Sequence, residues 1–144
     1  MRAVVQRVKE ASVKIDGKVV GSIDQGYLIY LGVHVSDTID IASKMAQKIH
    51  ALRIFEDEQG KMNLSISQVH GKILLISQFT LYGDPKGNNR PSFIEAARPE
   101  LAEPLYEHVF HALSQDHHVE RGIFGADMKV SSVNDGPVTI IIEF

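Results

Sequence analysis

The chain has no cysteine and no long hydrophobic run. Without cysteine it has no disulfide framework, no thiol nucleophile and no cysteine-based zinc or iron–sulfur site. Polar residues interrupt every apolar stretch before it reaches membrane-spanning length, and the first residues lack the pattern of a signal peptide. These absences predict a soluble, cytoplasmic protein.

An excess of positive charge is also missing. The sequence has 15 Lys and Arg residues against 18 Asp and Glu residues, a formal net charge of −3. Because Lys and Arg neutralise phosphates in most non-specific nucleic-acid binding, an extended contact with DNA or RNA is not expected. Any contact with RNA should therefore be local.

Three common enzyme motifs do not occur. The sequence has no Gly-x-Ser-x-Gly elbow, no P-loop and no dinucleotide fingerprint, so a hydrolase here would need an unconventional mechanism. What is present fits one domain. The 144 residues match the common domain size, and 44% of them are hydrophobic, which predicts a single core over residues 1–144.

The first half of the chain predicts β structure followed by a helix. Apolar and polar residues alternate on both sides of Asp16-Gly17, which supplies the turn of a hairpin. A near-continuous apolar run at residues 27–33 predicts a central strand that is covered on both faces. Three- and four-residue apolar steps between residues 37 and 52 predict an amphipathic helix, with Ser36 or Asp37 as its N-cap.

The second half predicts one strand, a loop, a helix and further strands. Residues 71–80 have the pattern of a buried strand, and the loop 83–91 is rich in residues that break regular structure. Proline is tolerated only in a first helical turn, so Pro104 predicts a regular helix that begins near Glu103 or follows a short turn. The last predicted strands are 119–124, 128–133 and 138–144. This order indicates an α+β fold whose two helices cover one face of antiparallel sheets.

Two segments are candidates for chemistry. In Ser77-Gln78-Phe79-Thr80 a buried strand delivers hydroxyls and an amide into a loop. These side chains can simply satisfy nearby backbone groups, or the backbone N–H groups can form an oxyanion hole, and the local sequence leaves both interpretations open. Gly136-Pro137 has the composition of an ordinary turn. An X-Pro bond can be cis, however, so the pair can also present two carbonyl oxygens in a fixed direction.

Other polar residues favour plainer interpretations. The adjacent His117-His118 do not form a chelating pair, and His108 and His111 lack a third ligand, so no metal site is predicted. Arg90 can bind a phosphate, although packing of its loop by Phe93 explains the segment equally well.

Taken together and in order, the motifs resemble those of the D-aminoacyl-tRNA deacylase family, formerly called D-tyrosyl-tRNA deacylases. The similarity extends along nearly the whole chain, and both signature motifs of the family are intact. The segments that carry it are Met1 to Val8, Phe55-Glu56-Asp57, Gly60 to Ser65, Ser77-Gln78-Phe79-Thr80-Leu81, Arg90-Pro91-Ser92-Phe93, Phe124 to Met128, and Asn134-Asp135-Gly136-Pro137-Val138-Thr139.

The resemblance implies a barrel-like core of antiparallel sheets with two main helices, and a homodimer without cofactor or metal. Gly136-Pro137, with a cis peptide bond, would project from one subunit into the pocket of the other. The implied catalytic residues are Ser77, Gln78, Phe79 and Thr80. The implied substrate-binding residues are Arg7, which would fix the crossing element, Phe124 and Met128, which would wall the terminal adenosine, and Asn134, Gly136 and Pro137.

The implied reaction is hydrolysis of the ester that joins a D-amino acid, or glycine mischarged on non-cognate tRNA, to the 3′ end of tRNA. Backbone N–H groups around Phe79 and Thr80 would stabilise the oxyanion while water attacks. No general base neighbours Thr80 in the sequence, so we expect it to position water and substrate rather than act as a nucleophile. The Gly136-Pro137 carbonyls would reject L side chains by clash, which is chiral proofreading in translation quality control.

The partners implied are the aminoacylated 3′ end of tRNA and a second copy of the chain, with no DNA and no membrane. Two other hypotheses remain open. A catalytically silent module that binds an RNA end or a nucleotide fits the lack of a general base in the motifs. A metal-dependent hydrolase that uses His117 would require a metal ion for activity.

Overall fold

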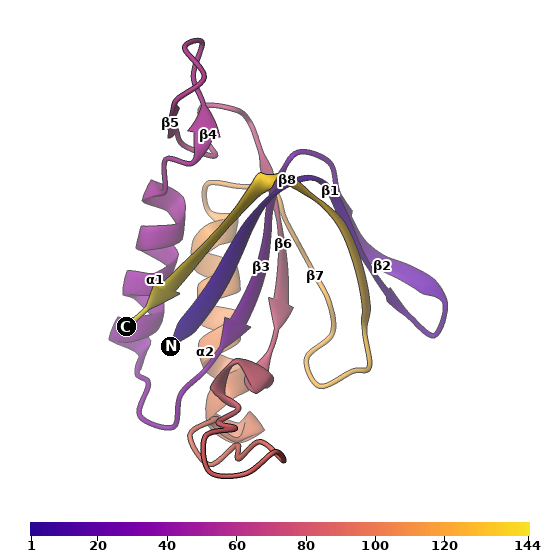
Figure 1. Cartoon of the computed structure of the whole chain (residues 1–144), viewed down its shortest axis with the longest axis vertical. Coiled ribbons are helices and arrows are strands. Elements are labelled where there is room, and N and C mark those ends of the chain that lie inside the picture. Colours follow the sequence, from indigo (N-terminus) through magenta and orange to yellow (C-terminus); the bar gives the residue numbers. More distant parts are fainter.

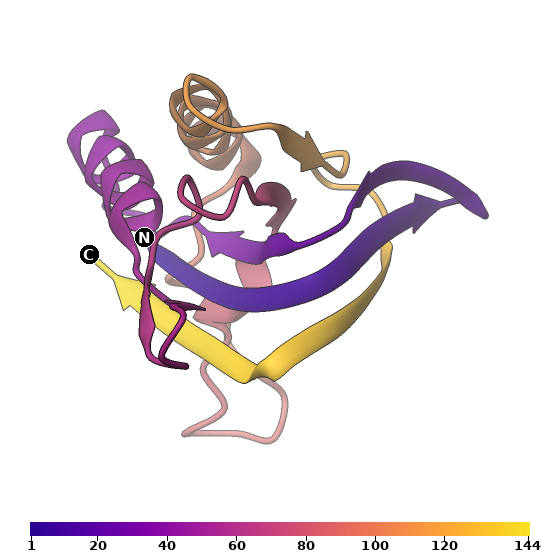
Figure 2. The same ribbon diagram turned by 90° about the horizontal axis from the view of Figure 1, so that it is seen from above.

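The computed structural model describes all residues from 1 to 144. A curved β-sheet forms a barrel-like core, and two α-helices cover one side of it (Figures 1 and 2). The predicted α+β class, with a barrel-like core and two main helices, is confirmed. The elements are β1 (Arg2–Ile15), β2 (Lys18–Ile23), β3 (Gly26–Gly32), α1 (Ile39–Ala51), β4 (Phe55–Glu56), β5 (Met62–Leu64), β6 (Lys72–Ser77), the 3-10 helix η1 (Phe79–Tyr82), α2 (Pro99–Ser114), β7 (Val119–Arg121) and β8 (Lys129–Glu143).

Strand β1 organises the sheet. Its first half pairs with β3 and its second half with β2, while β8 pairs with the other edge of β1 along most of its length. Beyond β3 the strand order continues through β6 to β7. The curvature seen in Figure 2 brings β2 back towards β7. Gly21 of β2 lies so close to β7 that a β-carbon added to it would be 3.0 Å from the carbonyl oxygen of Arg121. This approach gives the core its barrel-like shape.

The expectation of purely antiparallel sheets is wrong for part of the molecule. Strand β6 runs parallel to both β3 and β7. Parallel neighbours need a crossover connection, and the two crossovers contain α1 and α2. Both helices therefore lie on the same face of the sheet and pack against each other (Figure 2).

The predicted hairpin and central strand are confirmed. Asp16 and Gly17 have φ angles of 50° and 77°, as a two-residue type I′ turn requires, and β1 and β2 pair in antiparallel register across them. Strand β3 lies between β1 and β6, and all but one of its residues are buried. The apolar run in the sequence reflects this burial on both faces.

Helix α1 is confirmed, but its cap is not the predicted one. The N-cap is Thr38, whose side chain accepts a hydrogen bond from the Ile41 amide, rather than Ser36 or Asp37. Asp37 accepts a 2.6 Å hydrogen bond from the Met1 ammonium group instead. A buried tertiary ion pair therefore takes Asp37 away from the helix end.

Helix α2 begins earlier than predicted. It starts at Pro99 and continues through Pro104, so the expectation of a start near Glu103 is wrong. Pro104 removes only the N–H that would bond to the carbonyl of Glu100, and both residues are exposed, so water can replace the lost donor. The buried face of the helix compensates; it consists of Ala102, Leu105, Tyr106, Val109 and Leu113.

Three strand boundaries also differ from the expectations. Strand β6 ends at Ser77 rather than Thr80, because the chain turns into η1. The strand expected over 119–124 ends at Arg121. The break expected at residues 134–137 is a bulge inside one long strand, β8, which pairs with β1 on both sides of it.

The core lies between the sheet and the helices. A cluster of 24 buried residues joins β1, β3 and β6 to α1 and α2, and a second cluster of 7 residues fills the end of the barrel near β2. No helix in the chain combines the length and the hydrophobicity that a membrane crossing demands.

Candidate active site

The end of β6 forms the floor of the site. The Gln78 amide continues the sheet by donating a 2.8 Å hydrogen bond to the carbonyl of Leu31, and the chain then turns into η1. The first N–H groups of a helix have no acceptor within it, and those of Phe79 and Thr80 form no bond to the carbonyl three residues earlier. Two neighbouring backbone donors are therefore available at this turn. They can stabilise a negatively charged oxygen.

The hydroxyl of Thr80 has one hydrogen-bond partner, the side-chain amide of Gln78, which donates to it. No histidine, carboxylate or lysine contacts the hydroxyl oxygen. A neutral hydroxyl needs such a base to act as a nucleophile. The arrangement therefore favours a positioning role for Thr80.

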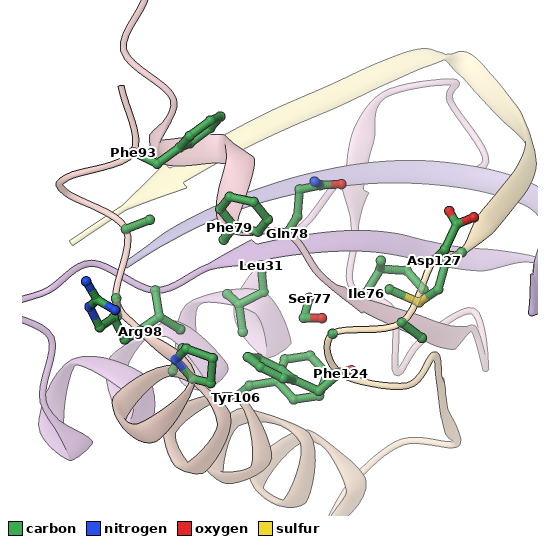
Figure 3. A pocket seen from close by; sticks show the side chains of 18 of the residues that line it. Leu31, Ile76, Ser77, Gln78, Phe79, Phe93, Arg98, Tyr106, Phe124 and Asp127 are labelled. Atoms are coloured by element: carbon green, nitrogen blue, oxygen red, sulfur yellow. The ribbon is translucent and has the colours of Figure 1, made fainter. Parts of the chain in front are cut away.

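A cavity of about 540 Å³ opens beside this turn (Figure 3). Its volume lies within the range of roughly 300–1,000 Å³ that is typical of small-ligand sites. The walls come from the ends of β3 and β6, from the loop before α2, from the first turns of α2, and from the segment between β7 and β8. Most of the lining side chains are apolar, so the cavity suits a flat, largely apolar group such as a nucleobase.

Aromatic side chains shape the cavity. The buried Tyr106 hydroxyl donates a 2.9 Å hydrogen bond to the carbonyl of Leu75, and burial raises the pKa of this tyrosine, so it stays a neutral donor. Its ring centroid lies 5.9 Å from that of Phe124. At the rim, Phe79 and Phe93 meet edge to face, with their centroids 5.2 Å apart. The pairs fix the cavity walls by packing.

The second candidate segment of the sequence, Gly136-Pro137, lies in the bulge of β8. Asn134 pairs with Val8 and Thr139 with Gln6, so residues 135–138 bulge out opposite the single residue Arg7. The Gly136-Pro137 peptide bond is cis. The Asn134 side-chain amide closes the bulge, because it donates 3.0 Å hydrogen bonds to the carbonyls of Arg7 and Val138.

Arg7 supports this bulge from below. Its side chain is only 5% exposed and donates hydrogen bonds to the carbonyls of Ile54 (2.8 Å) and Asp135 (3.2 Å). The carboxylates of Asp135 and Glu56 lie 3.4 and 3.7 Å from its nitrogens and balance its charge. Above it, Gly136 has a φ of 127°, and a β-carbon there would lie 2.7 Å from the Val138 side chain. Only glycine fits this position without strain.

The two regions lie at opposite ends of strands β3 and β6. Arg7 pairs with Tyr27, whereas Ser77 pairs with Leu31, four positions further along β3. At about 3.3 Å per residue, this separation is on the order of 13 Å along the strands alone. In Figure 1 the corner of β8 accordingly lies by the starts of β3 and β6, whereas the turn after β6 lies below the arrowhead of β6.

The structure thus brings together only part of the predicted site within one chain. Five of the predicted residues line the cavity, namely Ser77, Gln78, Phe79, Phe124 and Met128. Thr80 lies on the same turn, outside the lining. The other four lie around the bulge: Gly136 and Pro137 within it, Asn134 at its edge and Arg7 opposite it on β1.

Among the lining residues that sequence reasoning missed are Tyr106 and Arg98. Tyr106 belongs to the buried stripe of α2, and the three- and four-residue spacing of that stripe was the available signal. Arg98 is the N-cap of α2, a position that rarely holds a basic residue, and this anomaly was its signal. Arg90, the phosphate candidate, is exposed and does not line the cavity.

The histidines do not converge on the cavity. His50 and His117 lie within 2.9 Å of each other between α1 and the end of α2, and His108 contacts Ser43. Burial and the neighbouring His50 lower the pKa of His117. No group of three His, Asp or Glu side chains is arranged to hold a metal ion.

The fold and the cavity place the chain in a class of barrel-like α+β proteins that is known from solved structures. One, described as a c-Myc DNA unwinding element binding protein, superposes with a TM-score of 0.94 at 41% identity and covers 100% of this chain and 99% of its own. Another, described as a probable eukaryotic D-amino acid tRNA deacylase, gives a TM-score of 0.86 at 16% identity. The superposition covers 98% of this chain and 97% of the other. The second likeness supports the fold alone.

Sequence comparison identifies the family. The family model described as D-Tyr-tRNA(Tyr) deacylase matches residues 4–143. A D-aminoacyl-tRNA deacylase from Geobacillus sp. (strain WCH70) is 56% identical over 144 residues, and one from Thermus aquaticus is 54% identical over 145 residues. Each match covers 99% of this chain and 95% of the relative. The chain belongs to the D-Tyr-tRNA(Tyr) deacylase family, as the resemblance predicted.

Proposed function

We propose that this chain hydrolyses the ester bond of D-aminoacyl-tRNA and releases the free D-amino acid and tRNA. Two relatives that are more than half identical over nearly the whole chain carry the name of this activity. The observation that carries the proposal in the structure is the pair of unpaired amides, Phe79 and Thr80, at the edge of a nucleoside-sized cavity. A site of this kind suits a planar ester whose oxygen becomes negatively charged during hydrolysis.

The reaction proceeds by direct attack of water on the ester carbonyl. The carbonyl oxygen takes up negative charge and receives hydrogen bonds from the amides of Phe79 and Thr80. The tetrahedral intermediate then collapses, the bond to the ribose 3′ oxygen breaks, and the proton lost by the water passes to that oxygen. Because no protein base contacts Thr80, the 2′-hydroxyl of the substrate itself helps to activate the water.

The complete site is composite, with Gly136-Pro137 of one subunit in the cavity of a second copy. The support for this arrangement is that the pair is exposed, firmly anchored by Arg7 and Asn134, and far from the cavity of its own chain. Such an anchored projection has no evident purpose inside one subunit. A symmetric dimer would use two copies of the same contact.

The two carbonyl oxygens of this pair act as a stereochemical gate. They lie where the side chain of an L-amino acid would lie, so L substrates are rejected by a steric clash. D substrates are therefore selected without being bound more tightly. Glycine has no side chain to reject. The gate therefore admits glycine, and mischarged glycyl-tRNA is a further substrate.

The terminal adenosine lies against Phe124 and Met128, where an aromatic ring and a thioether offer an apolar surface. Contact is limited to the end of the tRNA, which agrees with a formal net charge of −3. For the same reason we expect no DNA partner, although one relative of known structure is described as a DNA-binding protein. We expect the chain to act in the cytoplasm, with no membrane partner.

Incubation of the purified protein with D-tyrosyl-tRNA, L-tyrosyl-tRNA and glycyl-tRNA tests the activity and the gate. We expect release of D-tyrosine and glycine and protection of the L ester. Binding of a D-aminoacyl-adenosine analogue without turnover would instead support a silent RNA-end binding module. Activity that chelators abolish would support the metal-dependent alternative.

Mixing two inactive variants tests the composite site. Phe79→Pro removes one amide donor, and Gly136→Val disrupts the gate, so a heterodimer of the two retains one intact site out of two. Because half of randomly formed dimers are mixed, about a quarter of the wild-type activity should return in a symmetric dimer. Sedimentation of the wild type reports its oligomeric state. A monomer, or no recovery on mixing, would contradict the proposed arrangement.

A further inference from the structure

Arg98 is the one uncompensated charge on the wall of the cavity. The only other charged lining residue, Asp127, is paired with Lys129 at 2.8 and 2.9 Å. The Arg98 guanidinium forms no ion pair, no hydrogen bond and no stacking contact with another residue. Figure 3 shows Arg98 on one side of the cavity and Asp127 on the other. A free cation therefore lies at one side of a largely apolar site.

The position of Arg98 does not favour the stability of its own helix. It is the N-cap of α2, where Ser, Thr, Asp or Asn would accept a hydrogen bond from the first turn, and its side chain forms no such bond. A positive charge is also unfavourable at the positive end of the helix dipole. Sequences that break local rules without a structural gain do so mainly at functional sites. The guanidinium is thus available for a ligand.

We propose that Arg98 binds the phosphate group that joins the terminal nucleoside of the RNA to the preceding nucleotide. This inference rests on the proposed function, which places the ester at Phe79 and Thr80 and the nucleoside against Phe124. The phosphate is the anion nearest to that nucleoside in any polynucleotide 3′ end. Guanidinium groups donate parallel hydrogen bonds to phosphate oxygens, so arginine suits this ligand.

The contact sets a further element of specificity. An aminoacyl ester of free adenosine lacks this phosphate and leaves Arg98 unused, whereas the end of a nucleic-acid strand engages it. The site therefore prefers an aminoacylated polynucleotide to an aminoacyl nucleoside. The paired charge of Asp127 and Lys129 offers no comparable attraction on the other side of the cavity.

The experiment compares two small substrates that differ at this phosphate. They are the D-tyrosyl ester of adenosine and the D-tyrosyl ester of the dinucleotide cytidylyl-adenosine. We expect Arg98→Gln to lower kcat/KM for the dinucleotide ester and for D-tyrosyl-tRNA by about ten-fold, through a higher KM, which is typical for loss of one exposed charged hydrogen bond. Hydrolysis of the adenosine ester should not change. Arg98→Lys should lower kcat/KM for the dinucleotide ester less than Arg98→Gln does, because lysine keeps the positive charge but supplies only a point charge.

Lys86→Gln is the matched control. It removes a positive charge from a neighbouring exposed loop that does not line the cavity, and it should leave all three substrates unaffected. Equal losses on both esters in Arg98→Gln, or a loss confined to Lys86→Gln, would overturn the proposal. The salt dependence gives an independent measurement. Loss of one single-strand phosphate contact should reduce the slope of log kcat/KM against log salt by about 0.7.

Failure of this inference is distinct from failure of the proposed function. Wild-type turnover of the adenosine ester, which lacks the phosphate, supports the function whatever the role of Arg98. If no ester is hydrolysed, binding of the non-hydrolysable amide analogue of the dinucleotide ester remains measurable. A Kd that is unchanged in Arg98→Gln would then refute the phosphate contact by itself.

Discussion

The cavity at the end of β6 and the Gly136-Pro137 bulge of β8 are held by different forces. Packing builds the cavity, where Tyr106 is 2% exposed and aromatic pairs set the distance between its walls. The bulge is exposed, and a few directed hydrogen bonds from Arg7 and Asn134 set its shape. The cavity therefore tolerates small changes of its surface, whereas the bulge depends on each of its anchors.

In both regions the backbone supplies the polar groups that face the substrate, but side chains hold the backbone in place only at the bulge. At the turn after β6 the available donors are amides, which belong to the backbone. At the bulge the available acceptors are carbonyl oxygens, which also belong to the backbone, but side chains hold them in place. Substitutions that alter the backbone should thus have the largest effects in both regions, and substitutions of side chains smaller ones.

The largest effect is expected from Phe79→Pro, which removes one amide donor. Proline suits the first position of a helix, and Gln78 before it has a φ of −146° and a ψ of 81°, outside the α region that a following proline disfavours, so the fold should persist. Loss of one oxyanion donor lowers kcat by about 100- to 1,000-fold. Phe79→Ala, measured beside it on D-tyrosyl-tRNA, keeps the N–H and should retain most of the activity. Equal loss in both variants would assign the effect to the ring.

Gly136→Val should lower D-tyrosyl-tRNA hydrolysis by about 100-fold, since displacement of a positioning element by about 1 Å has effects of this size. A side chain at this φ is strained and meets the Val138 side chain and the Arg7 guanidinium. Gly87→Val is the matched control, because a β-carbon there meets no atom within 4 Å. Full activity of the Gly136 variant would show that the bulge takes no part in the reaction.

Asn134→Ala removes a side chain that bridges both ends of the bulge. Losing its two hydrogen bonds should lower the free energy of unfolding by about 1–2 kcal/mol, and the loosened bulge should lower activity by about ten-fold. Thermal melting and initial rates measure the two effects. Asn88→Ala, in an exposed loop, should change neither. An Asn134→Ala variant with unaltered stability would mean that Arg7 alone holds the bulge.

Thr80→Ala should have the smallest effect, a decrease in kcat of about five-fold, as expected for the loss of one neutral hydrogen bond. The hydroxyl receives a hydrogen bond from Gln78 and contacts no base. Single-turnover rates on D-tyrosyl-tRNA measure the decrease, with Thr80→Ser as the control that keeps the hydroxyl. Complete loss with fold and substrate binding intact would identify Thr80 as a nucleophile.

Local sequence predicted most of the elements because their signals are local. The type I′ turn at Asp16-Gly17, the apolar run of β3 and the helical spacing of α1 each depend on residues close in the chain. The errors arose where a distant contact prevailed. Asp37 left the helix cap for the Met1 ammonium, and the buried face of α2 carried the helix through Pro104.

The candidate site was predicted in part for the same reason. The strand end at Ser77 and the Gly136-Pro137 pair have local signatures, and the family resemblance supplied their significance. Tyr106 and Arg98 reach the cavity only because the crossover between β6 and β7 returns α2 over the sheet. Nothing near either residue in the sequence specifies that return. The parallel pairing of β6 with β3 and β7 was missed because it joins segments far apart in the chain.

The backbone donors after β6 make the chemistry robust to mutation. Every residue except proline supplies the same N–H group, so most single-nucleotide changes in these codons preserve the groups that stabilise the oxyanion. An alanine scan of Ser77 to Thr80 would therefore find no position whose loss abolishes the reaction. Selection on this stretch should act on the shape of the turn rather than on the identity of a reactive side chain.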